Sequence, residues 1–229
     1  MKISSEEKKG LIIQNFVSLL QQYGIEKVTL SDVAEKSGLT KSALYYYFDS
    51  KEALIIASFK KYRTMMTGKL DALLKKAKNP KETINLYCDF LFDLPKDKDF
   101  ARLMTFSDKV IEELAKYVVS VPAVTNEIVQ SKKADRDQIT KMISQYAGCS
   151  EDDPKIKKIA LFFTLSCGET LKYMFKVAHS NLQGSPNSEI CQLETEYKET
   201  IKSLSKEDFS TFIISGLDAL IKINFKDKN

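Results

Sequence analysis

The chain has 229 residues, of which 43% are hydrophobic and 29% are charged, and it carries 35 lysines and arginines against 31 aspartates and glutamates. This length suits one or two domains with a sizeable hydrophobic core, and the net charge of +4 permits binding to nucleic acid without requiring it. The four cysteines are far apart and there is one histidine, which excludes zinc-type spacing, so we expect reduced thiols and neither a metal nor another cofactor.

Neither export nor insertion into a membrane is expected. The first ten residues, MKISSEEKKG, are not followed by the apolar core of a signal peptide. The longest apolar run, residues 159–165, is far shorter than a membrane-spanning helix. We therefore expect a cytoplasmic protein without a membrane partner.

The first expected helix runs from about Ser4 to Tyr23. Serines followed by two glutamates are typical of a helix start, and apolar residues then recur at helical spacing until Gly24 ends the pattern. We expect this helix to share a small core with the next two helices. The residues expected in that core are Phe16, Leu20, Val33, Leu44 and Phe48.

Two short helical patterns follow within residues 29–51, TLSDVAEKSGLTKSALYYYFDSK, and Gly38 separates them. Thr29 or Ser31 is placed to cap the first pattern, and Thr40 is placed to cap the second. Two short helices joined by a turn that contains glycine are typical of a helix-turn-helix.

The second of these short helices has a polar side that favours contact with DNA. Leu44 and Phe48 are four residues apart and point one way, so the lysine, the serine and the tyrosines beside them cannot all be buried. Exposed lysine, serine and tyrosine supply donors to phosphates and apolar contacts for thymine methyl groups. The alternative is that Tyr45, Tyr46 and Tyr47 wedge the helix against its neighbours, and the spacing does not decide between the two.

The rest of the chain predicts helices and shows no strand-like alternation. The helix from residue 51 to about 78 is long enough to act as a stiff lever in a conformational switch. Later helices are expected at about 81–94, 100–106, 110–118, 139–146, 154–178, 189–203 and 206–225. Loops are expected at 95–99 and 181–188, and a bend or gap at Pro122 and the polar run 130–137.

The run GIEKVTLSDVAEKSGLTKSALYYYFDSKEAL, residues 24–54, resembles the N-terminal signature of the TetR family of transcriptional regulators. In that family the recognition helix ends in Leu-Tyr-x-x-Phe and is followed by Ser-Lys-Glu, and residues 44–52 match this pattern in order. Two features depart from the family. Residue 47 is often histidine there and is Tyr47 here, and Asn15 and Phe16 stand where small residues are usual.

The resemblance implies an all-α protein with an N-terminal three-helix helix-turn-helix DNA-binding domain, residues 1–50. A larger helical ligand-binding and dimerisation domain, residues 51–229, would follow. The implied function is that of a ligand-responsive regulator, in our expectation a repressor, which binds palindromic operator DNA as a homodimer and is released by a small apolar molecule. The dimer would form through one helix from Pro154 to Ala178 and another from Lys206 to Phe225, both rich in apolar residues.

The resemblance also implies which residues meet the double-stranded DNA. By their positions in the family motif, the expected phosphate contacts are Thr29, Thr40, Tyr46, Tyr47 and Lys51. The expected base-edge contacts are Lys41, Ser42, Ala43 and Tyr45.

A pocket for a small-molecule effector is expected in the middle of the chain, where aromatic residues and methionines are frequent. Its candidate lining residues are Tyr62, Met66, Tyr87, Phe90, Phe106, Phe162, Phe163 and Tyr173. Glu169 is the candidate partner for a ligand amine or hydroxyl. The competing interpretation is that the apolar candidates are ordinary core residues and that Glu169 is solvated or hydrogen-bonded within the protein.

Two other classes of function were weighed. An enzyme is not expected, because the chain has no Gly-rich phosphate loop, no nucleophile elbow, no evident pair of catalytic carboxylates and no partner for its single histidine, His179. A helical ligand- or lipid-binding module without DNA affinity is the alternative function, and it would contain bound lipid instead of binding a duplex.

Overall fold

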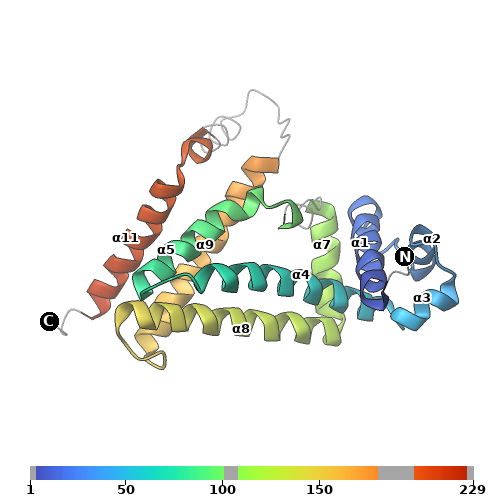
Figure 1. Ribbon diagram of the computed structural model, residues 1–229, viewed down its shortest axis with the longest axis horizontal. Helices are drawn as coiled ribbons and strands as arrows, with labels where there is room; N and C mark the ends of the chain where they lie inside the picture. Colours follow the sequence, from blue (N-terminus) through green and yellow to red (C-terminus); the bar gives the residue numbers. More distant parts are fainter. Residues whose placement is uncertain (1–3, 101–107, 180–198, 226–229) are drawn as a thin grey trace. The chain divides into compact units, whose positions relative to one another are not determined.

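The computed structural model describes residues 4–100, 108–179 and 199–225, which form helices joined by short connections and contain no strand (Figure 1). Residues 199–203 are helical, and the other elements are α1 (Ser5–Tyr23), α2 (Leu30–Lys36), α3 (Lys41–Tyr47), α4 (Lys51–Leu74), α5 (Pro80–Asp93), the 3-10 helix η1 (Leu94–Lys96), α7 (Asp108–Ser120), α8 (Pro122–Ala147), α9 (Pro154–His179) and α11 (Lys206–Asn224). The all-α fold class is confirmed. None of the described helices is long and apolar enough to cross a bilayer.

The chain forms two compact units, and each combines segments that are distant in the sequence. Among the described residues, the first unit contains 4–68 and 108–132, and the second contains 69–100, 133–179 and 199–225. The boundary between these units does not fall after residue 50, the end of the expected DNA-binding domain. The reason is that the first part of α4 and all of α7 pack with the N-terminal helices. The division into a DNA-binding domain, residues 1–50, and a ligand-binding and dimerisation domain, residues 51–229, therefore stays a prediction about which part performs which function.

Local capping fixes the helices of the N-terminal region. Ser4 caps α1 by accepting a hydrogen bond from the backbone N–H of Glu7, whose carboxylate accepts one from the Ser4 N–H in return. Thr29 and Asp32 form the same reciprocal pair at the start of α2. Gly24 ends α1 with a φ of +81°, a conformation that favours glycine. The predicted start and end of the first helix are thus confirmed.

The core of the first unit is the cluster of apolar side chains that the sequence predicted, extended by α4. Phe16, Leu20, Val33, Leu44 and Phe48 are all buried there. Leu54 of α4 is fully buried in the same cluster, so the three N-terminal helices depend on the first turns of α4 for part of their core.

Asn15, one of the departures from the family pattern, has a structural role. Its Nδ2 atom donates hydrogen bonds to the backbone carbonyl of Lys36, 3.3 Å away, and to the Oγ atom of Ser37, 3.1 Å away. The last carbonyls of a helix lack intrahelical donors. Asn15 therefore holds the end of α2 against α1.

The core of the second unit lies between α5, α9, α11 and the end of α8. Ile84, Cys88, Ile143, Phe163 and Phe209 are among its buried side chains. Burial raises the pKa of the Cys88 thiol to about 12, and it raises that of Cys167, also in this core, to about 12 as well. Both thiols therefore stay protonated near neutral pH and behave as small apolar core groups.

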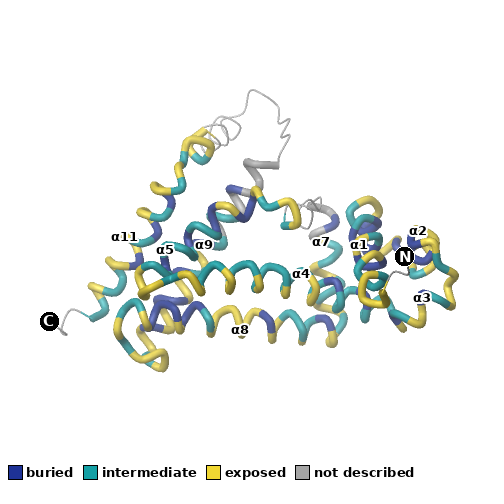
Figure 2. Tube along the Cα trace, viewed as in Figure 1, coloured by how far each residue is buried: buried dark blue, intermediate teal, exposed yellow. Residues whose placement is uncertain are grey.

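One expected interruption was wrong. The polar run at residues 130–137 does not bend or break the chain, because α8 continues through it from Pro122 to Ala147. Residues 132–137 are all exposed, whereas Ser131, Ile139 and Thr140 are buried on either side of them (Figure 2). The polar residues reflect a solvated stretch of one long helix.

Two smaller expectations also differ from the structure, and three others lie wholly or mostly outside the described residues. The long helix α4 ends at Leu74, before the expected residue 78, and the expected loop at 95–99 begins with η1. The helix and loop expected at 100–106 and 181–188 lie outside the described residues, apart from residue 100, and only 199–203 of the helix expected at 189–203 are described.

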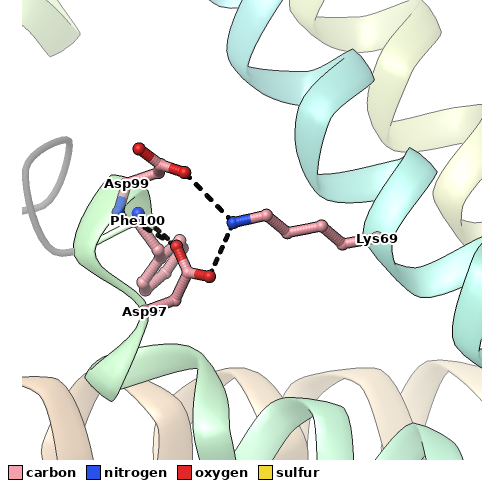
Figure 3. A network of polar contacts seen from close by, with 4 residues as sticks. All are labelled: Lys69, Asp97, Asp99 and Phe100. Atoms are coloured by element: carbon pink, nitrogen blue, oxygen red, sulfur yellow. Dashed lines mark hydrogen bonds and ion pairs between the residues drawn. The ribbon is translucent and has the colours of Figure 1, made fainter.

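A polar network in the second unit joins the last part of α4 to the segment after η1 (Figure 3). The Nζ atom of Lys69 lies 2.6 Å from Oδ2 of Asp97 and 3.2 Å from Oδ2 of Asp99. The other carboxylate oxygen of Asp97 accepts hydrogen bonds from the backbone N–H groups of Asp99 and Phe100, both at 3.0 Å. This arrangement ties the last part of a long helix to a short loop through one ammonium group and two carboxylates.

Candidate nucleic-acid interface

The turn between α2 and α3 sets the direction in which α3 leaves the core. Gly38 lies in this turn with a φ of +63°, in the left-handed region that favours glycine. Thr40 then caps α3, because its Oγ1 atom accepts a hydrogen bond from the backbone N–H of Ala43 at 3.1 Å. A threonine hydroxyl that accepts in this way can still donate its hydrogen to a phosphate.

Two apolar residues anchor α3 and leave its other side in solvent. Leu44 is fully buried and Phe48, which follows the helix, is buried as well. On the opposite side Lys41 and Ser42 are exposed, and the exposed fractions of Tyr45 and Tyr46 are 45% and 82%. Ala43, next to Ser42, is half-buried. A lysine, a serine and two tyrosines therefore project from one short helix.

Tyr47 differs from the two tyrosines before it. It is half-buried and packs against the core of the first unit. Its ring meets the ring of Tyr46 edge-on, with the centroids 5.2 Å apart. The wedge interpretation thus describes Tyr47, and Tyr45 and Tyr46 stand in solvent.

Thr29 and Lys51 are placed differently from the residues of α3. Thr29 is exposed, but its hydroxyl donates to Oδ2 of Asp32 at 2.7 Å as part of the cap of α2. The Nζ atom of Lys51 donates to the backbone carbonyl of Ile25, and it lies 5.9 Å from the centroid of the Tyr117 ring. Burial lowers the pKa of Lys51. Its ammonium group is thus directed into the unit.

Sequence reasoning missed a second set of contacts, in which α7 meets the helix-turn-helix. The hydroxyl of Tyr117 donates to Oε1 of Glu52 at 2.6 Å. Leu114 and Tyr117 both pack against the core that contains Leu44 and Phe48. No sequence pattern could reveal this contact, because the bonded residues are 65 positions apart in the chain.

The candidate pocket residues do not form one group in the described structure. Tyr87 and Phe163 are neighbours in the second unit, with ring centroids 5.9 Å apart, and Phe90 packs against the same core. Tyr62 and Met66 are half-buried in the first unit.

Of the three remaining aromatic candidates and the one carboxylate candidate, only Phe162 has a described side chain. Phe162 is 63% exposed on α9. Glu169 and Tyr173 belong to α9, but their side chains are not described, and Phe106 lies outside the described residues. The structure therefore brings together Tyr87, Phe90 and Phe163 from the predicted set.

The two helices expected at the dimer interface expose apolar side chains. On α9 these are Leu161, Phe162 and Leu165, which lie on one side of the helix. On α11, Phe212 is 76% exposed, and Ile223, three turns further on, is also exposed.

Comparison with known proteins agrees with the fold and with the helix-turn-helix. Residues 12–57 match the family described as bacterial regulatory proteins, tetR family. The chain is 28% identical over 130 residues to YerO of Bacillus subtilis, an uncharacterized HTH-type transcriptional regulator, and the match covers 55% of this chain and 45% of YerO. It is 38% identical over 52 residues to IcaR of Staphylococcus aureus, the HTH-type negative transcriptional regulator of the biofilm operon icaADBC, covering 23% of this chain and 28% of IcaR.

A solved structure extends the likeness in fold to most of the chain. The crystal structure of a TetR transcription regulator from Haloarcula marismortui superposes with a TM-score of 0.60 at 15% identity, and the match covers 90% of this chain and 97% of that one. The chain spans less than half of the length of YerO and of IcaR. Residues 12–57 of this chain are thus similar to the N-terminal region of the tetR family of bacterial regulatory proteins, and the all-helical fold is similar to that of a TetR transcription regulator over most of the chain.

Proposed function

We propose that the protein is a ligand-responsive repressor that binds palindromic operator DNA as a homodimer. The observation that carries the proposal is the outer side of α3, where Lys41, Ser42, Tyr45 and Tyr46 are exposed while Leu44 anchors the helix. A side of this kind fits the major groove, which admits an α-helix and presents donors, acceptors and thymine methyl groups at the base edges.

The individual contacts follow from this orientation. We assign base-edge contacts to Lys41, Ser42, Ala43 and Tyr45, and phosphate contacts to Thr29, Thr40, Tyr46 and Tyr47. Exposed Tyr46 is the best placed of the phosphate donors, whereas Tyr47 is half-buried. Thr29, whose hydroxyl donates to Asp32, and Lys51, whose ammonium donates to the Ile25 carbonyl, would each need to release that contact to reach a phosphate.

A homodimer would provide two copies of α3 for the two halves of a palindrome. The exposed apolar side chains of α9 and α11 support it, since unpartnered side chains of this size are unfavourable in water. On α11, the exposed residues Phe212, Gly216 and Ile223 lie on one side, and the space around Gly216 is open. Two helices from each subunit can pack as a four-helix bundle on such a surface.

Release by a small apolar effector is the third part of the proposal. Tyr87, Phe90 and Phe163 place one phenolic hydroxyl within an apolar region of the second unit. Burial raises the pKa of Tyr87, so this hydroxyl remains a neutral donor and acceptor. An effector that favours a conformer with mismatched α3 spacing would lower operator affinity by population shift. The match to IcaR, a negative regulator, supports repression over activation.

The proposal can be tested with the full-length protein and duplexes selected from a random pool. We expect the wild type to recover a palindromic sequence and to bind it modestly more weakly as salt increases, because an ammonium group near the phosphates, such as that of exposed Lys41, releases counterions. Tyr45→Ala and Lys41→Ala should change the sequence preference, since both side chains are assigned to base edges. If the protein selects no sequence and carries bound lipid, it is a lipid-binding module and the proposal is wrong.

A further inference from the structure

The helix α7 is far from the helix-turn-helix in the sequence, but it belongs to the same compact unit. The family match ends at residue 57, whereas α7 begins at Asp108. Leu114 and Tyr117 of α7 pack against the cluster that contains Leu44, the anchor of α3. The unit that would present α3 to DNA is therefore completed by a helix outside the family signature.

One side chain of α7 reaches the start of α4. The Tyr117 hydroxyl donates to Oε1 of Glu52 at 2.6 Å, and Glu52 is the second residue of α4. Residues 48–51 are all that separates the end of α3 from Glu52 in the chain. A hydrogen bond to a carboxylate is stronger than one between neutral groups and has a narrower geometry. The connection that follows α3 is therefore held by α7.

The same side chain is linked to the connection that precedes α2. The Lys51 ammonium lies 5.9 Å from the centroid of the Tyr117 ring and donates to the carbonyl of Ile25, in the turn after α1. An ammonium group over an aromatic face is attracted by the ring electrons. Through Lys51 and Glu52, Tyr117 is thus connected to the chain on both sides of the α2–α3 pair.

A second contact lies one helical turn earlier on the same side of α7. A Cβ atom added to Gly24 would lie 2.2 Å from Oε2 of Glu113, so this carboxylate packs directly against the turn after α1. Residues four apart on a helix lie on one face. Glu113 and Tyr117 therefore define a single face of α7 that contacts both ends of the helix-turn-helix.

We propose that Tyr117 is a positioning residue for DNA recognition. Acting through Glu52 and Lys51, it fixes the orientation of α3 relative to α1 and α4, so that removing its hydroxyl weakens sequence discrimination. This inference rests on the proposed DNA-binding function. It adds to that function a residue outside the helix-turn-helix.

The test compares full-length wild type, Tyr117→Phe, Glu52→Gln and the double variant on two probes. One probe is a duplex recovered by the wild type from a random pool, and the other is a duplex of unrelated sequence. Tyr146→Phe is the matched control, because it removes a tyrosine hydroxyl that donates to the carboxylate of Asp218 at 2.7 Å in the second unit. All proteins are compared at a concentration where sedimentation gives the same oligomeric state.

We expect Tyr117→Phe to weaken binding to the selected duplex by about fivefold or more, the lower end of coupling between sites, and to leave the unrelated duplex unaffected. Glu52→Gln keeps an acceptor without the charge, so its loss should be smaller. The double variant should lose less than the product of the two single losses, because both changes remove one interaction. Tyr146→Phe should lose thermal stability while keeping its discrimination between the duplexes.

The outcomes separate this inference from the function on which it rests. If the wild type does not prefer its selected duplex, both are overturned. If the wild type discriminates and folded Tyr117→Phe discriminates equally well, only the positioning role is wrong. If Tyr117→Phe does not fold, Glu52→Gln decides alone, and unchanged discrimination in that variant overturns the inference.

Discussion

The two sides of α3 predict opposite effects for two alanine substitutions on the same helix. Leu44 is fully buried, and truncating a buried leucine to alanine costs about 2–5 kcal/mol of unfolding free energy. For a chain of this size, that loss lowers the melting temperature by about 4–20 °C. Tyr46 is 82% exposed, so Tyr46→Ala should change the unfolding free energy by about 0.5 kcal/mol or less, with the edge contact to Tyr47 as its main loss.

The effect on DNA binding should be the reverse for the folded proteins. Losing one hydrogen bond from Tyr46 to a charged phosphate costs about 1.5–3 kcal/mol, and a dimer loses it twice, so affinity should decrease by about 150-fold or more. Thermal unfolding and a mobility-shift titration with the selected duplex measure the two quantities. The assignment of the two sides of α3 is refuted if Tyr46→Ala unfolds as early as Leu44→Ala, or if it binds the duplex as tightly as the wild type.

Three further predictions concern other parts of the chain. Gly24→Ala should cost about 1–3 kcal/mol in a denaturant titration, because a φ of +81° strains alanine and its Cβ atom would meet Glu113; a wild-type midpoint would contradict this. The Tyr117 hydrogen bond lowers the pKa of Glu52 below its usual 4.5, so its stabilisation exists above that value and is lost as the pH falls through the lowered pKa. The melting temperatures of wild type and Tyr117→Phe should therefore converge as the pH falls through the lowered pKa of Glu52, and a constant difference would exclude this origin. Phe212→Lys should give a folded monomer in sedimentation, because this exposed ring is assigned to the dimer interface; a persistent dimer would remove it from that interface.

Local interactions explain why much of the N-terminal region could be predicted from the sequence. A cap such as that of Ser4 on α1 needs only residues three positions apart, and the inward direction of Leu44 and Phe48 follows from their spacing of four. The helices that contain these patterns formed where they were expected. The same periodicity left open whether the three tyrosines of α3 are buried, and the structure places Tyr45 and Tyr46 in solvent and leaves Tyr47 half-buried.

The second unit was harder to predict because aromatic residues in a core and in a pocket have the same spacing. Tyr87 and Phe163 meet only because α5 and α9 pack together, whereas Phe162, the neighbour of Phe163 in the chain, faces solvent. Composition placed all three in one candidate pocket. Which of them share a surface depends on the rotation of α9 about its axis, and contacts with distant helices set that rotation.

The sequence by itself determined the helical class and the resemblance of the N-terminal region to the TetR family, since each depends on periodicity or on a short motif. It left open whether the tyrosines of α3 face solvent. The tertiary structure alone decided that α8 is continuous, that the Lys51 ammonium turns to the Ile25 carbonyl, and that Tyr117 holds Glu52. The physical reason is the distance along the chain between interacting residues. Caps and helical faces involve residues three or four positions apart, whereas the helix that covers a given face is determined only when distant segments pack together and exclude water.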